Sequence, residues 1–421
     1  MINQTVPLDV QLQIELYLTD VQREALPEEI FDKLGADYIY SVGEDAPDLP
    51  NAMYLKLDAK ADEGRTCKVP LQKELSNPPT LGSTGDQRLN EEDWIMKYFR
   101  MEYTDVSHAT TNQKYGVEAL TKDPYKIFEY RATAMGKYYK QYYGKMRRQA
   151  LTENHSENLE QAPHFLTPGW NVHWYVPNVT NWAQPAYHTS YATHTNNIVT
   201  ALLSAGTGQN AAGTVVYFQR LEEWARTEKF IVPLEFEDGT NGYVVILPSP
   251  TARWMKNPTT GFGTLGALYT DSSKFSPEVK LMFPGLIGQV GGLRFVEDPR
   301  YATLTLGGSA SGSTGAGAGY SMTAQYRGMG NADDGSSDPR DKSANARLLG
   351  WLCGKACLCE WQPEGFHWEW EYVQYDKYFG SGVFCSVGIK SPIYTMTGAT
   401  SPNIQQMSSI CLPFAQPPQL V

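Results

Sequence analysis

The sequence predicts an α+β fold, and three observations support this prediction. An alternation of apolar and polar residues begins at Arg65, and a second extended run begins near Asp93. A long amphipathic helix is expected from Asp123 to about Leu151. Later in the chain, buried strand-like segments are joined to short helices. Extended strands and one long helix are therefore the expected framework of the protein.

Length and composition favour a folded protein of several subdomains. At 421 residues, the chain exceeds the size at which a single core usually divides. Hydrophobic residues make up 41% and charged residues 19%, which is typical of a folded soluble chain. The formal charge of −11 argues against a general grip on nucleic acid phosphates, and no apolar run of transmembrane length occurs. We expect a protein that is made in a cytosolic compartment and is not bound to a membrane.

The six cysteines are too few and too unevenly spaced for a disulfide framework, so reduced thiols are expected. The closest three are Cys353, Cys357 and Cys359, within ARLLGWLCGKACLCEW, which is apolar nearly all round and predicts a buried helix. On such a helix only the first two share a face, whereas zinc needs four convergent ligands. We predict buried thiols and no metal or cofactor site.

The two extended runs predict a long hairpin. Cys67, Val69 and Leu71 alternate with less apolar residues, as in a strand with one covered face. About twenty residues with two adjacent prolines and no helical period separate this strand from the second run. A hairpin with strands of this length reaches about 40 to 50 Å, too far to be buried on its own subunit. The alternative is a mobile surface loop.

The long helix has two distinct sides. Asp123 and Pro124 form a strong helix start. One face is an apolar stripe of Phe128, Met135, Tyr139, Tyr142 and Met146. The other faces carry Lys126, Arg131, Lys137, Lys140, Lys145, Arg147 and Arg148. Such a basic face either contacts nucleic acid or is a solvated surface that pairs with nearby carboxylates.

Glycine-rich segments mark the second half of the chain. FPGLIGQVGGLRFVEDPRY, residues 283–301, is expected to pack closely against its own sheet, or to be a glycine turn that leads into a core strand. It follows a helix expected at 213–229 and a buried strand at 244–247. The Gly/Ser/Ala-rich stretch 307–337 predicts a flexible excursion.

Two other classes of protein remain open on composition. Ten tryptophans and the acidic groups Glu91-Glu92-Asp93 and Glu222-Glu223 are compatible with a carbohydrate-active or carbohydrate-binding protein. The three close cysteines are compatible with a metal-thiolate protein. His188, His194 and His367 accompany no nucleophile motif and are read as structural residues.

A succession of segments carries a resemblance to a known family. In order they are NEEDW, DPYKIFEYRATAMGKYYKQYYGKMRR, LEEWARTEKF, GYVVILPSPTARWMKN, FPGLIGQVGGLRFVEDPR and ARLLGWLCGKACLCEW. Over roughly residues 60–395 the chain resembles the major capsid proteins of tailed bacteriophages, in the branch of the N-four-like phages. The resemblance implies the HK-97-like capsid fold. Its parts would be an N-terminal arm at 1–63, an extended β-hairpin (E-loop) at 64–104, a peripheral domain with a long spine helix at 105–190, an axial domain at 191–344 with the Gly-rich excursion 307–337, and a return to the peripheral domain with the C-terminal segment at 345–421.

The resemblance also implies a function without catalysis. The protein would assemble from many copies of itself, as hexamers and pentamers, into an icosahedral shell around double-stranded DNA. It would reside in the virion and be assembled in the cytoplasm of a bacterial host. Portal, scaffolding and decoration proteins are further expected partners. Contacts between subunits are expected at Leu75, Pro78, Pro79, Leu81, Arg88 and Leu89. Weak contacts with DNA on the inner face are expected at Lys137, Lys140, Arg147 and Arg148.

Overall fold

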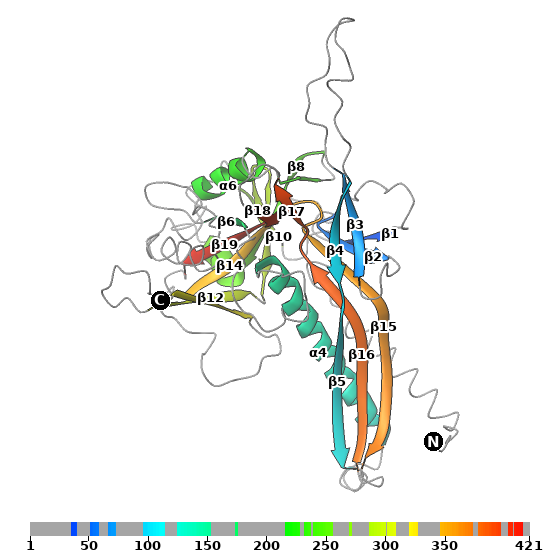
Figure 1. The fold of residues 1–421 in the computed structure, drawn as a ribbon. Coiled ribbons are helices and arrows are strands. Elements are labelled where there is room, and N and C mark those ends of the chain that lie inside the picture. Colours follow the sequence, from blue (N-terminus) through cyan, green and yellow to red (C-terminus); the bar gives the residue numbers. More distant parts are fainter. Residues whose placement is uncertain are drawn as a thin grey trace, which may run out of the picture.

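Two sheets and one long helix make up the body of the molecule in the computed structural model (Figure 1). The structure describes residues 35–39, 51–58, 66–72, 96–113, 124–152, 173–175, 215–227, 231–236, 239–255, 269–271, 286–299, 301–308, 320–326, 346–373, 378–396, 403–406 and 408–415.

The first sheet has five strands in the order β1-β2-β15-β16-β5. Its strands are β1 (Gly35–Ile39), β2 (Tyr54–Asp58), β5 (Thr104–Gln113), β15 (Leu358–Val373) and β16 (Tyr378–Lys390). The last three are long and antiparallel, and they run together toward one end of the molecule (Figure 1). Helix α4 (Pro124–Thr152) lies along one face of these long strands.

The second sheet has ten strands, with the central order β13-β12-β14-β8-β11-β10-β9. These strands are β8 (Asn241–Pro248), β9 (Tyr269–Asp271), β10 (Leu286–Val290), β11 (Leu293–Asp298), β12 (Ala302–Gly308), β13 (Tyr320–Tyr326) and β14 (Ala346–Cys353). Three more attach to it, β6 (His173–Trp174), β7 (Leu234–Glu235) and β19 (Ser409–Ala415). Helices α6 (Val215–Thr227) and α7 (Ser249–Met255) pack against this sheet.

Two smaller pairs complete the fold. Strands β3 (Thr66–Gln72) and β4 (Met96–Glu102) form an antiparallel hairpin that pairs with neither large sheet (Figure 1). Strands β17 (Ile393–Met396) and β18 (Asn403–Gln406) form the other pair.

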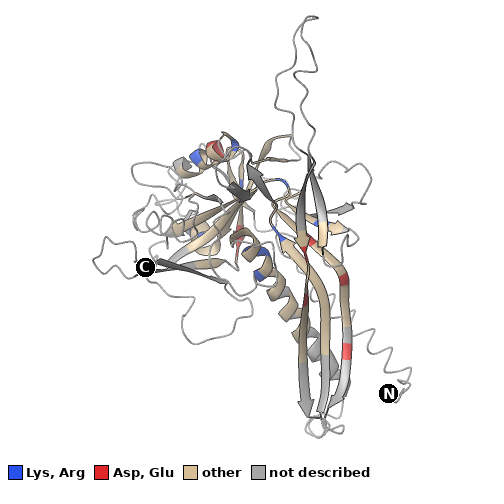
Figure 2. Ribbon diagram, in the orientation of Figure 1, with Lys and Arg blue, Asp and Glu red and all other residues tan. Residues whose placement is uncertain are grey.

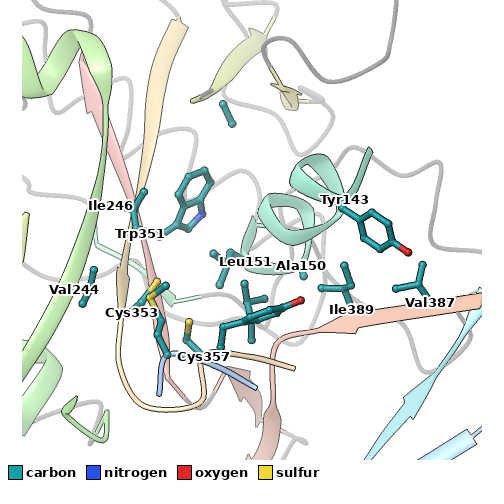
Figure 3. Packing of buried hydrophobic residues seen from close by; sticks show 14 of the residues in the cluster. Tyr143, Ala150, Leu151, Val244, Ile246, Trp351, Cys353, Cys357, Val387 and Ile389 are labelled. Carbon is teal, nitrogen blue, oxygen red and sulfur yellow. The ribbon is translucent and has the colours of Figure 1, made fainter. Parts of the chain in front are cut away.

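Two hydrophobic cores hold these layers together. One fills the space between α4 and both large sheets, and in Figure 3 Leu151 of α4 lies between Trp351 of β14 and Ile389 of β16. The other lies on the opposite face of the ten-stranded sheet, where Phe218 and Leu221 of α6 are fully buried. Because α4 belongs to the first core, it connects the two sheets.

Several sequence-based predictions are confirmed. The long helix begins at Pro124 and the second helix spans Val215–Thr227, close to the expected limits. Strand β8 is buried along nearly its whole length and leads into α7, as its apolar run and proline predicted. The two extended runs pair as a hairpin, from Thr66 opposite Glu102 to Gln72 opposite Met96.

The predicted helix over ARLLGWLCGKACLCEW is wrong, because this segment forms β14, a tight turn and the start of β15. Alternate residues of β14 enter different cores: Trp351 and Cys353 pack with α4, whereas Leu352 packs with α6. A strand covered on both faces is apolar at every position, so its sequence imitates a buried helix. The turn contains Ala356 at a φ of 53°, which no regular helix allows.

Two expected boundaries also change. Residues 51–58, assigned to an N-terminal arm, lie in the body, where Tyr54 and Leu55 of β2 are fully buried. The stretch 307–337 is not wholly an irregular excursion, because β13 at Tyr320–Tyr326 pairs with β12. In β13 apolar and polar residues alternate, a strand period that the surrounding glycines and serines obscured.

Candidate assembly elements

The β3–β4 hairpin is anchored at its root. Cys67 and Met101, which are paired across the hairpin, are 2% and 0% exposed. Thr66 is also buried. Residues 73–95, which join the two strands in the sequence, lie outside the described residues. They include the expected contact residues Leu75, Pro78, Pro79, Leu81, Arg88 and Leu89. What the structure shows is an element fixed at one end whose paired strands leave the body (Figure 1).

Helix α4 packs on the long strands through aromatic side chains. The Tyr139 hydroxyl donates a hydrogen bond to the Val383 carbonyl oxygen, at 2.5 Å. Tyr138 stacks on His108 with ring centroids 4.0 Å apart, and Tyr139 meets Phe366 edge to face at 5.2 Å. The predicted stripe is confirmed where it is described, with Met135 and Tyr139 buried. The long strands and α4 therefore form one stiff unit.

The C-terminal part of α4 is tied to both sheets by buried ion pairs. Arg147 donates to the Glu360 carboxylate of β15 at 3.1 Å and to the Tyr54 hydroxyl of β2 at 3.0 Å. Arg148 forms two 2.8 Å hydrogen bonds with the Asp298 carboxylate of β11. Adjacent residues of one helix thus hold two different sheets, and bidentate geometry makes the second pair the stronger one.

These contacts correct part of the expected DNA-facing surface. Arg147 and Arg148 are each 2% exposed, so their charges face carboxylates inside the protein instead of DNA outside it. Of the alternative stated for the basic face, a solvated surface that pairs with carboxylates, the pairing holds for these two residues and the solvation does not. The side chains of Lys137 and Lys140 lie outside the described residues. The sequence of the helix does not distinguish the two buried arginines from the lysines. It does not show which turns of the helix are covered by strands from other parts of the chain.

A third polar contact extends this junction. The Trp351 indole nitrogen of β14 donates to the Thr152 hydroxyl at 3.1 Å, and that hydroxyl donates to the Arg148 carbonyl oxygen at 2.9 Å. The last turn of α4 is therefore linked by side chains to both sheets. The relative orientation of the two sheets is fixed at this helix end.

In the glycine-rich segment, the described residues 286–299 form a hairpin turn that leads into a core strand, the second of the two stated interpretations. Gly291 has a φ of 57°, a conformation that favours glycine. A β-carbon on Gly292 would lie 2.6 Å from Oε1 of Glu222 in α6. The Glu222 carboxylate accepts a hydrogen bond from the Gly292 amide at 3.2 Å. The glycines thus allow the turn to approach α6 closely.

The six cysteines are all buried and form no disulfides. Burial raises the thiol pKa of four of them, Cys357, Cys359, Cys385 and Cys411. Loss of solvation raises the pKa of Cys359 from 9.0 to about 12 and that of Cys385 to about 11. Loss of solvation and the Cys353 side chain raise the pKa of Cys357 well above its usual value. Within the described residues, no cluster of His, Cys, Asp or Glu is arranged to hold a metal ion.

These thiols predict a loss of stability in alkali. Between about pH 9 and the raised pKa, the unfolded chain has lost the thiol proton that the folded chain keeps, so the free energy of unfolding falls with rising pH. We expect a loss of up to about 1.4 kcal/mol per pH unit for each such thiol. Urea unfolding across this range measures it, and Cys359→Ala should show a smaller slope than the wild type. An equal slope in both proteins would contradict the prediction.

The tryptophans do not form an exposed platform in the described region. Trp351 and Trp361 are 0% and 1% exposed, and Trp224 of α6 is also buried. Of the carboxylates proposed for sugar chemistry, Glu222 binds the Gly292 amide, and Glu91, Glu92 and Asp93 lie outside the described residues. His367 is exposed and stacks on Phe384, with ring centroids 5.4 Å apart.

The exposed charges on the long strands are acidic. Asp105, Glu364 and Glu369 are exposed there, and acidic positions follow β15 in Figure 2. Helix α6 instead carries side chains of both charges, as Figure 2 also shows.

None of the described helices has the length and hydrophobicity needed to cross a membrane.

The fold is similar to those of several phage capsid proteins. A chain from the capsid of Ralstonia phage GP4 matches with a TM-score of 0.50, 14% identity and 94% coverage of both chains. A chain from the acid-stable capsid of Helicobacter pylori bacteriophage KHP30 gives 0.55 and 12% identity, covering 92% of this chain and 91% of that one. A chain from the head of Helicobacter pylori bacteriophage KHP40 gives 0.52 and 12%, covering 93% and 91%.

These likenesses establish the fold, which is the α+β, HK-97-like fold of phage capsid subunits. No family model matches the sequence, and no curated protein matches it. The fold is therefore shared with chains whose sequence similarity is slight. The N-four-like branch named in the sequence comparison stays a prediction.

Proposed function

We propose that this protein is the major capsid protein of a tailed bacteriophage and assembles with copies of itself into a closed shell. The observation that carries the proposal is the extent of the fold likeness, because it covers more than nine-tenths of the chain and of each of three phage capsid chains. The role is structural and not catalytic. The described tryptophan side chains are buried, and the Glu222 carboxylate accepts a hydrogen bond from the Gly292 amide. Neither observation supports the carbohydrate alternative.

The architecture suits repeated association. A shell needs contacts that close into rings of subunits, made by elements that project from a stiff body. The β3–β4 hairpin is such an element, and the long strands with α4 are such a body. We assign the hairpin to the E-loop and α4 with the five-stranded sheet to the peripheral domain. We assign the ten-stranded sheet to the axial domain. This assignment includes β14 and β19, which lie in the segment 345–421 that the resemblance gave to the peripheral domain.

Contacts between subunits would come from the hairpin. Its tip, with Leu75, Pro78, Pro79, Leu81, Arg88 and Leu89, would lie across a neighbouring copy in hexamers and pentamers. Such obligate contacts typically bury several thousand Å² in total, about 2,000 to 5,000 Å². Assembly would take place in the cytoplasm of a bacterial host, with portal, scaffolding and decoration proteins as further partners of the virion.

The direct test is the assembly state of the purified protein. Size-exclusion chromatography followed by negative-stain microscopy should show capsomers or closed particles of megadalton mass. A small soluble oligomer at every concentration, without particles, would contradict the proposal. Release of reducing sugar from polysaccharide would favour the carbohydrate alternative.

We predict that Lys137 and Lys140, the two other members of the expected DNA-facing set, affect DNA and not assembly. Particles carrying Lys137→Glu and Lys140→Glu should form normally but hold at least about twofold less DNA. Each reversal replaces a positive charge that can contact a phosphate, and the loss is repeated in every subunit of the shell. The measurement is the DNA content of particles from infected cells. The matched control is Lys137→Arg with Lys140→Arg, which keeps the charge. Normal DNA content in the Glu variant would place this face away from the genome.

A further inference from the structure

The hairpin leaves the body where one strand changes partner. Strand β4 ends at Glu102 and β5 begins at Thr104, and the two lie end to end in Figure 1. Before Tyr103 the chain pairs with β3, and after it the chain pairs with β16. The direction of the hairpin relative to the long strands is therefore decided at residues 102–104.

This change of partner takes place over a glycine. The β16–β5 ladder ends where Val387 pairs with Thr104, and the next residue is Gly388. A β-carbon on Gly388 would lie 2.3 Å from the Glu102 carbonyl oxygen, 3.1 Å from its carbon and 3.3 Å from the Tyr103 α-carbon. Gly388 is not among the glycines of positive φ in the described chain. The requirement at this position is for space and not for backbone freedom.

The cross-strand neighbour of Gly388 completes the contact. Trp361 of β15 pairs with Gly388 and is 1% exposed. Its ring meets the Tyr103 ring edge to face, with centroids 5.4 Å apart. Gly388 and Trp361 thus form a socket that receives the backbone of Glu102 and the side chain of Tyr103. We call these two residues the hairpin socket.

A displacement at the buried base of the hairpin is expected to change the direction of both of its strands. Thr66, opposite Glu102 in the hairpin, is 5% exposed, and Cys67, opposite Met101, is 2% exposed. Because both strands are held at this level, a shift of Glu102 cannot be absorbed by one strand alone. A displacement at the root therefore changes the direction of the hairpin.

We propose that the hairpin socket, Gly388 with Trp361, sets the direction in which the hairpin leaves the body and so positions it for assembly. The assembly part rests on the proposed capsid function, whereas the direction itself is a property of the single subunit. Any side chain at position 388 would push the Glu102 carbonyl away by roughly 1 Å, since van der Waals contact permits no closer approach. Gly388 and Trp361 act as positioning residues.

The first test measures the direction of the hairpin in unassembled subunits. Cysteines introduced at Gln72 on β3 and at Gln219, which is exposed on α6, are spin-labelled; the six native thiols are buried. Electron-resonance distances are then compared between the wild type and Gly388→Ala. We expect the mean distance to shift or its distribution to broaden. An unchanged distribution would overturn the proposal.

Two alanine variants serve as controls. Gly365 on β15 has no atom near its added β-carbon, so Gly365→Ala should leave the distance unchanged. Gly350 of β14 is crowded, with the Ile246 carbonyl oxygen 2.7 Å from the added β-carbon, but it lies in the ten-stranded sheet. Gly350→Ala should lower thermal stability without the change in distance. If it moved the hairpin as Gly388→Ala does, general loosening would replace the socket as the explanation.

The second test uses assembly. Shell yield should fall at least ~10-fold in Gly388→Ala and stay normal in Gly365→Ala. If Gly388→Ala does not fold, Tyr103→Ala takes its place, with Tyr103→Phe as the variant that keeps the ring contact. An unchanged distance in Tyr103→Ala would then overturn the proposal. A wild-type protein that forms no shells would count against the capsid function, while the distance measurement would still decide on the socket.

Discussion

Deletion of residues 76–90 is expected to give a folded subunit that forms no closed shells. The described body does not include these residues, and residues 73–75 and 91–95 remain to connect β3 with β4. The free energy of unfolding of the subunit should therefore change little. Closed particles should fall by at least about a hundredfold, because a shell repeats the lost contact at every subunit. Urea unfolding and negative-stain microscopy of the same preparation provide the two measurements.

A matched variant distinguishes the effect of the length of the hairpin from the effect of its particular contact residues. In it, residues 76–90 keep their number and composition but are placed in scrambled order. If the tip works through Leu81, Arg88 and Leu89, the scrambled hairpin should also fail to assemble. If reach alone matters, it should assemble, and the predicted contact residues would then be wrong. Normal shells from the deletion itself would remove the hairpin from the assembly mechanism.

Loss of the buried Arg148–Asp298 pair is expected to be the most destabilising single change. Arg148→Met would leave the Asp298 carboxylate, whose side chain is 2% exposed, without the two hydrogen bonds from Arg148. Removing one partner of a buried ion pair typically costs about 3–5 kcal/mol. Urea unfolding at neutral pH measures this loss. The variant should also hold its two sheets less firmly, because the pair connects α4 to β11.

Two further variants give this prediction its controls. In Arg148→Met combined with Asp298→Leu no unpaired charge remains, so most of the lost stability should return. The exposed pair of Arg226 with Glu222, at 3.4 Å, serves for comparison, and Arg226→Met should cost only about 0.5 kcal/mol. Equal losses in Arg148→Met and Arg226→Met would contradict the role assigned to the buried pair.

The elements that local sequence signals define were predicted well. Three sequence signals specify α4 without any distant contact: the N-cap type of residue at Asp123, the proline at Pro124 and the apolar stripe. The alternation around Val69 specifies β3 in the same way, because one side of the strand is apolar. Gly291 likewise marks a turn through its own backbone requirement.

Sequence-based prediction failed for elements whose neighbours are distant in the chain. The segment around Trp351 is apolar at nearly every position and therefore predicts a helix. Only its pairing with β8, β12 and β19 makes it a strand. The resemblance places residues 51–58 in an arm, whereas in the structure β2 pairs with β15, some three hundred residues away in the chain. Neither partner can be inferred from a local window.

The same distinction between local signals and distant contacts applies to the assembly elements. The position of the hairpin follows from an alternating segment and a second extended run, whereas the socket joins Glu102 to Gly388 through a contact between distant strands. The charges of Arg147 and Arg148 are visible in the sequence, but their burial depends on Glu360 and Asp298, which other sheets bring to them. By itself the sequence determined the long helix, the hairpin and the acidic balance, since these depend on neighbouring residues and on composition. The tertiary structure alone decided which charges are paired inside and where the hairpin is held, because such contacts exist only after remote strands have come together.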